Sequence, residues 1–134
     1  MPVVFERSEF PLVTVRFRGA QTLTEFEGYL AALAELYREG RPFGLVCDSR
    51  GAEAPPAVHR KLQADFIAQH GRLIRSLNLG TAFVIDSVLL RGALTAILWL
   101  QPLPCPHFVS GDVEEARRWA RARLNGLPNQ KLVG

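Results

Sequence analysis

The chain has 134 residues, of which 48% are hydrophobic and 22% are charged, and its formal net charge is +3. This length fits one domain, and the apolar content excludes a disordered chain. The basic residues are scattered over several expected elements without a recognised motif, so we expect no nucleic-acid partner. The two cysteines form no CxxC pair and no Cys/His cluster, which argues against a zinc site and a disulfide scaffold.

The first expected element is a hairpin near the N-terminus. Residues 3–6 and 12–19 read VVFE and LVTVRFRG, which are runs typical of strands, and Pro11 fits the bend between them. The N-terminal residues show no basic segment followed by an apolar core and a cleavage site, so we expect no signal peptide. We therefore expect a cytoplasmic protein whose thiols are reduced.

An amphipathic helix and a buried strand are expected next. Apolar residues recur at helical spacing within residues 21–40, where Thr22 or Thr24 is the expected N-cap and Gly40 the expected stop. Residues 42–48 read PFGLVCD, a short apolar run that ends in an acidic residue. This pattern predicts a buried strand whose C-terminal end opens at an edge of the sheet.

The second half of the chain continues the alternation of helices and strands. Residues 57–78 repeat apolar side chains, from Val58 onward, close enough to helical spacing to predict one long surface helix with Gly71 as a kink. Strands are expected at residues 79–86 and 105–110, and each is followed by a helix.

The element order predicts the fold class. Strands that alternate with helices imply right-handed crossovers and parallel pairing, and the N-terminal hairpin adds an antiparallel member. We therefore expect one small α/β domain over residues 1–134, with a mixed, mostly parallel sheet of about five strands and about four helices. The tail from about residue 126 is expected to be loose.

The most apolar run of the chain is SVLLRGALTAILWLQPLP, residues 87–104. Arg91 interrupts this run and prolines end it, so the expected helix has roughly four turns and a length of about 20 Å, against about 30 Å of hydrocarbon in a bilayer. We therefore expect no membrane span, and Ser87 is well placed to cap the helix.

This helix is expected to be apolar nearly all round, whereas a surface helix normally has a single apolar stripe. The run either lies deep in the core or presents an outer face, with Leu98 and Trp99 as members, to another chain. We favour the interface, with a symmetric homodimer as its expected form. The candidate contact residues are Leu90, Leu94, Leu98 and Trp99, together with Phe66 and Ile67 of the preceding helix.

Catalytic chemistry finds little support in the sequence. No feature couples a histidine to a nucleophile, and Cys47 is flanked by Asp48, whose charge tends to raise a thiol pKa. Asp48 and Asp86 both end expected strands, where paired carboxylates can hold Mg²⁺, but we prefer helix capping for them. We therefore expect no catalytic site, no metal and no cofactor.

Two segments carry a resemblance to a known family. The segment FVIDSVLLRGALTAILWL and the ending PHFVSGDVEEARRWARARL, taken with the element order, resemble the SpoIIAA-like or STAS-like proteins, the superfamily of sulfate transporters and anti-sigma-factor antagonists. The resemblance covers most of the chain. It implies a small regulatory or protein-interaction module that binds a protein partner and has no catalytic activity.

The resemblance also directs attention to the loop that begins CDSRGAEAPP. In anti-sigma-factor antagonists, a serine in a DSSGL-type motif at the start of the second helix is a phosphorylation switch. Asp48, Ser49 and Arg50 stand in the matching place, as a phospho or ligand loop, although no SGL follows and two prolines occupy the expected helix start. The alternative for Ser49 is a hydrogen bond to the loop backbone.

Two other functions remain open at this stage. The first is an apolar-ligand or lipid-binding domain, because the STAS-like fold is often compared with lipid-transfer domains. A cavity of about 300 Å³ or more between the first helix and the sheet is the observation that favours it. The second is an enzyme that uses the strand-end loop at Asp48.

Overall fold

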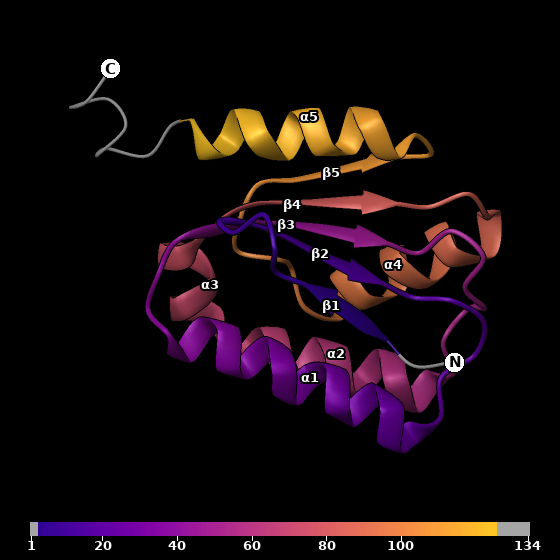
Figure 1. Ribbon diagram of the computed structural model, residues 1–134. Coiled ribbons are helices and arrows are strands. Elements are labelled where there is room, and N and C mark those ends of the chain that lie inside the picture. Colours follow the sequence, from indigo (N-terminus) through magenta and orange to yellow (C-terminus); the bar gives the residue numbers. More distant parts are fainter. Residues whose placement is uncertain (1–2, 126–134) are drawn as a thin grey trace.

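One five-stranded sheet organises the protein, which we describe from a computed structural model that covers residues 3–125. The strand order is β1-β2-β3-β4-β5; β1 pairs antiparallel with β2, and the other neighbours pair parallel. The expected mixed, mostly parallel sheet is confirmed (Figure 1). The strands are β1 (Val4–Glu6), β2 (Leu12–Arg16), β3 (Phe43–Asp48), β4 (Asn78–Val84) and β5 (His107–Ser110).

Helices cover both faces of this sheet. In Figure 1, α5 lies alone on one face, while α1 and α2 run along the other. Side chains of α4 share the core of α1 and α2, so this helix belongs to the same layer. The expected tail from about residue 126 lies outside the described residues. The helices are α1 (Leu23–Arg38), α2 (Ala57–Gln69), α3 (Gly71–Leu77), α4 (Val88–Leu100) and α5 (Val113–Leu124).

The single long helix expected over residues 57–78 is two helices, and the break between them lies next to Gly71, where a kink was expected. The backbone leaves helical geometry at His70, with φ −105° and ψ 16°, and α3 starts at Gly71. The buried face of α2 also differs from the expected one. His59, Phe66 and Ile67 are buried, whereas Val58 is exposed, so the inward stripe at the start of the helix is shifted by one residue.

Local sequence determines where the other helices begin and end. Thr22 and Glu25 form a reciprocal capping box at the start of α1, and Gly40 follows its end with φ +74°, a conformation that favours glycine. Asp112 caps α5 by accepting a hydrogen bond from the backbone of Glu114 at 2.9 Å. These positions agree with the expected boundaries to within one or two residues.

The two faces of the sheet have separate cores. The core under α5 is built from small and aliphatic residues, among them Ala116 and Ala120, which are fully buried. The core under α1, α2 and α4 is rich in aromatic rings, for example Phe26 and Tyr29, whose centroids lie 5.4 Å apart. The candidate site lies on this second, aromatic side.

Candidate functional site

A strand-end loop, residues 48–56, contains the predicted group Asp48, Ser49 and Arg50. Asp48 is the last residue of β3 and is 1% exposed. Arg50 donates hydrogen bonds from Nε to Oδ1 of Asp48 at 2.9 Å and from Nη2 to Oδ2 at 2.8 Å. Arg18 donates a third, from Nη2 to Oδ2 at 3.3 Å. The loop is therefore anchored by a buried carboxylate that holds two arginines.

These contacts determine the charge of Asp48. Burial raises the pKa of the Asp48 carboxyl, but hydrogen bonds from the side chain and backbone of Arg50, together with the charge of Arg18, outweigh burial, so the net pKa lies below the ordinary value. Both carboxylate oxygens are engaged by arginines. Asp48 is thus an ionised anchor of the loop.

Ser49 lies in a turn and not at the start of a helix. Its backbone N–H donates to Val84 at 2.9 Å, and its carbonyl accepts from Ala52 at 3.1 Å. The next helix, α2, begins eight residues later at Ala57. A phosphate on Ser49 would therefore not meet the N-terminal dipole of α2, whereas the resemblance implies a serine at the start of that helix.

The capping role expected for Asp48 and Asp86 is wrong. The N-cap of α2 is Pro56, which makes no side-chain capping bond. The N-cap of α4 is Ser87, as expected, and its Oγ accepts from the N–H of Leu90 at 3.4 Å. Within residues 3–125 no three His, Cys, Asp or Glu side chains gather as a metal site.

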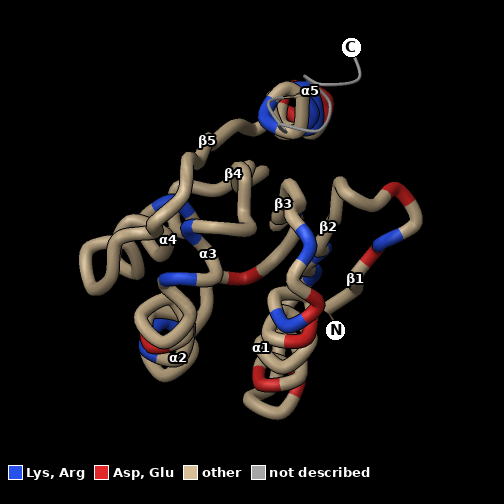
Figure 2. The backbone as a smooth tube through the Cα atoms, turned by 90° about the vertical axis from the view of Figure 1, so that its left-hand side faces the viewer, with Lys and Arg blue, Asp and Glu red and all other residues tan. Residues whose placement is uncertain are grey.

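The helix α4 has an exposed apolar face. Val88 and Trp99 are each 86% exposed, Leu89 is 76% exposed and Leu100 is 65% exposed. Arg91 is the only charged residue of the helix, which Figure 2 shows as almost entirely uncharged beside α1, α2 and α5. We call this surface the α4 outer face; its residues are Val88, Leu89, Arg91, Gly92, Thr95, Trp99 and Leu100. Among residues 3–125, no helix is both long and apolar enough to cross a bilayer.

The residues predicted for an interface divide into three groups. Trp99 lies on the α4 outer face. Leu94 and Leu98 are half-buried. The other three are enclosed by their own domain and are not available to another chain, because they form the inner surfaces of α2 and α4; they are Leu90, Phe66 and Ile67.

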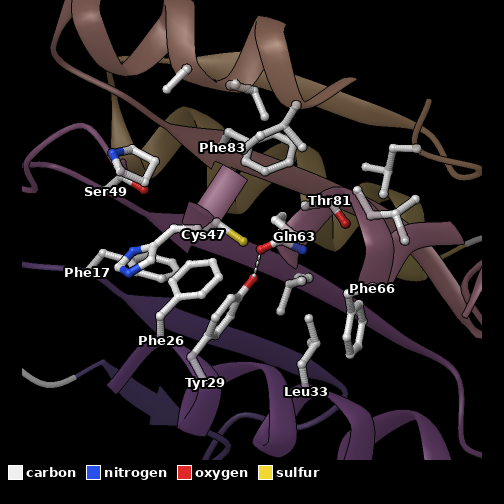
Figure 3. A pocket seen from close by; sticks show the side chains of 18 of the residues that line it. Phe17, Phe26, Tyr29, Leu33, Cys47, Ser49, Gln63, Phe66, Thr81 and Phe83 are labelled. Atoms are coloured by element: carbon white, nitrogen blue, oxygen red, sulfur yellow. Dashed lines mark hydrogen bonds between the residues drawn. The ribbon is translucent and has the colours of Figure 1, made fainter. Parts of the chain in front are cut away.

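A cavity of about 150 Å³ lies between the sheet and the helices α1, α2 and α4. Aromatic side chains form much of its wall, and Figure 3 shows Phe17, Phe26, Tyr29 and Phe83 around it. This volume is smaller than the cavity of about 300 Å³ that would favour a lipid-sized ligand. The cavity therefore has the size of a single small molecule and not of a lipid tail.

Polar groups also line this cavity. The Tyr29 hydroxyl donates to Oε1 of Gln63 at 3.0 Å, and the sulfur of Cys47 points toward the same region (Figure 3). His59 stacks on Phe26 with ring centroids 4.6 Å apart and is 4% exposed. The sequence alone did not predict this group. The available signal was that His59 and Gln63 continue the spacing of Phe66 and Ile67 along one face of α2.

The thiols are not activated. Burial, followed by the charges of Cys105 and Asp48, raises the pKa of Cys47 to about 12. Burial raises the pKa of Cys105 to about 11. Both groups therefore stay protonated at neutral pH, as expected for core cysteines and not for nucleophiles.

The histidines lie in separate places. His59 faces the cavity, His70 donates from Nδ1 to the carbonyl of Phe66 at 3.0 Å, and His107 is exposed on β5. None of the three is hydrogen-bonded to a serine, cysteine or carboxylate among the described residues. The arrangement therefore contains no paired nucleophile and base.

Comparisons with known proteins identify the fold. Neither a family model nor a curated protein matches the sequence. Among solved structures, the anti-sigma factor antagonist SpoIIAA in its unphosphorylated form superposes with a TM-score of 0.63 at 14% identity, covering 93% of this chain and 99% of that chain. An uncharacterized DUF3478 protein of SpoIIAA-like fold from Shewanella loihica gives a TM-score of 0.61 at 17% identity over 88% and 91% of the two chains.

A third structure agrees with these two. An anti-sigma factor antagonist from Mycobacterium paratuberculosis superposes with a TM-score of 0.58 at 16% identity, covering 89% of this chain and 92% of that chain. All three matches extend over nearly the whole of each partner. The expected STAS-like architecture is therefore confirmed at the level of the fold.

Proposed function

Because the chain has the SpoIIAA-like fold and a helix face with several exposed apolar side chains, we propose that it is a non-enzymatic regulatory domain that acts by binding protein. The observation that carries this proposal is the exposure of four large apolar side chains on the α4 outer face. Exposed apolar patches of this kind mark interaction sites. Two of the similar structures are anti-sigma factor antagonists, which supports a regulatory role.

The chemistry of the polar residues supports a role without catalysis. The Cys47 thiol has a pKa near 12, so a thiolate nucleophile does not form at neutral pH. The Asp48 carboxylate, the second candidate, is held by Arg18 and Arg50. Both cysteines are free, which is consistent with the reducing cytoplasm.

The partner that we propose for the α4 outer face is a second copy of the chain. Val88 stands at one end of this face and Trp99 at the other, and Arg91 and the smaller Gly92 and Thr95 lie between them. A Cβ on Gly92 would meet nothing within 4 Å, so the centre of the helix is open to close approach. An antiparallel pair of α4 helices places Trp99 of each copy beside Val88 of the other.

Sedimentation velocity at micromolar concentrations tests this interface. We expect the natural chain to sediment as a dimer and Trp99→Glu to sediment as a monomer, because the dimer would bury an unpaired carboxylate. Leu23→Glu is the matched control: Leu23 is an exposed leucine of α1, so this variant should remain dimeric. A natural chain that is monomeric throughout this range, or a Trp99→Glu variant that stays dimeric, contradicts association through α4.

A further inference from the structure

The cavity between α1, α2, α4 and the sheet has a function of its own. We infer that it is a binding site for one small, uncharged ring molecule that carries a hydroxyl or carbonyl oxygen, which contacts Gln63 and His59. This inference does not depend on the α4 outer face, because different side chains carry it. It rests on the size of the cavity, on its unpaired polar groups, on its lack of cations and on its opening to the surface.

The size fits one ring. The cavity measures about 150 Å³. Apolar cavities of about this volume in other proteins bind benzene. The rings of Tyr29, Phe66 and Phe83 line the cavity, and such rings favour stacked or edge-on contact with a flat ligand.

Two polar side chains in the cavity have unused hydrogen-bonding capacity. Gln63 accepts a bond from Tyr29 on Oε1, while its Nε2 donates to no described residue. His59 is 4% exposed, and its imidazole ring makes no hydrogen bond within residues 3–125. No buried side-chain N or O atom in this range is both sealed from solvent and unpaired, so these nitrogens border accessible space. They therefore face positions that a ligand oxygen can occupy.

The same two residues are four positions apart on α2, which places them on one side of the helix. A single ligand atom near this side can accept a hydrogen bond from Gln63 and exchange one with His59. This spacing explains why both side chains point inward. Phe66 and Ile67 lie further along the same buried side of α2.

The charge of the lining disfavours an anionic ligand. Glu53 is the only Asp, Glu, Lys or Arg among the described residues of the wall, and it is exposed. An anionic ligand would therefore be desolvated with no lysine or arginine to compensate it. Ser49, Ala52 and Glu53 of the strand-end loop line the cavity and are partly or fully exposed, so we place the ligand entrance at this loop.

Calorimetric and ¹H–¹⁵N NMR titrations of the full chain with phenol, benzene and benzoate test the inference. We expect saturable binding of phenol, weaker binding of benzene and none of benzoate, with the resonance shifts centred on α2 and β3. No saturable binding of phenol or benzene overturns the inference, and so does benzoate that binds as well as phenol.

Variants test which residues form the site. Ala93→Phe fills the cavity from α4 and should abolish phenol binding; if this variant does not fold, Cys47→Leu fills it from β3. Gln63→Leu should weaken phenol roughly three- to tenfold and leave benzene unchanged, as loss of one hydrogen bond predicts. Gln69 lies on the same helix but is exposed and outside the cavity, so Gln69→Leu should change the affinity for neither phenol nor benzene. A folded, cavity-filled variant that binds phenol like the natural chain excludes this location.

Discussion

The two faces of the sheet differ in how closely helices approach them. Under α5 the approach is so close that a Cβ on Gly80 would lie 2.7 Å from Cγ of Arg123 and 2.9 Å from the Trp119 ring. On the other face, α1, α2 and α4 leave a cavity of about 150 Å³ over the same strands. One face is built for tight packing, and the other leaves room for a ligand.

Alternating residues of the same strands produce this difference. In β3, Val46 belongs to the core under α5, and the next residue, Cys47, lines the cavity. In β4, Ala82 faces α5, while Thr81 and Phe83 line the cavity. Because successive side chains of a strand point to opposite faces, a single sheet carries a purely apolar surface and a mixed one. Substitutions at neighbouring positions should therefore have very different effects.

The largest effect is expected on the α5 face. Gly80→Val should lower the free energy of unfolding by about 2 kcal/mol, because the new side chain would overlap the Trp119 ring. Urea denaturation gives the value. Gly28→Ala is the control: a Cβ on this exposed glycine of α1 meets nothing within 4 Å, and stability should rise by up to about 1 kcal/mol. An unchanged unfolding energy for Gly80→Val would show that the α5 face is not tightly packed.

An intermediate effect on stability is expected at the C-terminal end of the central strand β3, where Asp48 lies. Asp48→Asn should cost about 1–2 kcal/mol at neutral pH, because a buried carboxylate that accepts bonds from partly exposed arginines is lost. The folded-state pKa of Asp48 is lowered, so its contribution is complete above the ordinary pKa and disappears as pH falls through the lowered value. The difference between the two proteins should therefore shrink below about pH 4.

Unfolding of both proteins from pH 7 to pH 2 measures this dependence. A difference in unfolding energy that stays constant through the acid range would mean that Asp48 contributes by shape alone and not by charge.

The smallest effect is expected inside the cavity. Cys47→Val should change the free energy of unfolding by less than about 1 kcal/mol, because the neighbouring space accommodates the change in shape and the thiol donates no hydrogen bond. Urea denaturation alongside Gly80→Val compares the two faces directly. If Cys47→Val lowered the free energy of unfolding more than Gly80→Val, the cavity face and not the α5 face would be the more tightly packed one.

The sequence predicted the sheet and most helix boundaries, because these depend on local patterns such as the Thr22 cap and the Ser87 cap. It failed for α4, where apolar residues surround the whole helix and give no sign of which side meets the sheet. Of the residues predicted at an interface, Trp99 is exposed as that prediction requires, whereas Leu90 is buried against its own domain. It also failed for the cavity, whose polar residues His59 and Gln63 come together with Tyr29 only when α1 packs beside α2.

The outermost strands of the sheet are short, which limits strand addition by other molecules. The edge strands β1 and β5 have three and four residues, fewer than any of the three strands between them. Arg16 and Glu6, an ion pair between β2 and β1, add charge beside one of these edges. Short edge strands, one of them beside an ion pair, offer few free main-chain groups to a foreign strand and so oppose aggregation by strand addition. Neighbouring molecules are thus left to meet this domain through helix side chains and not through its backbone.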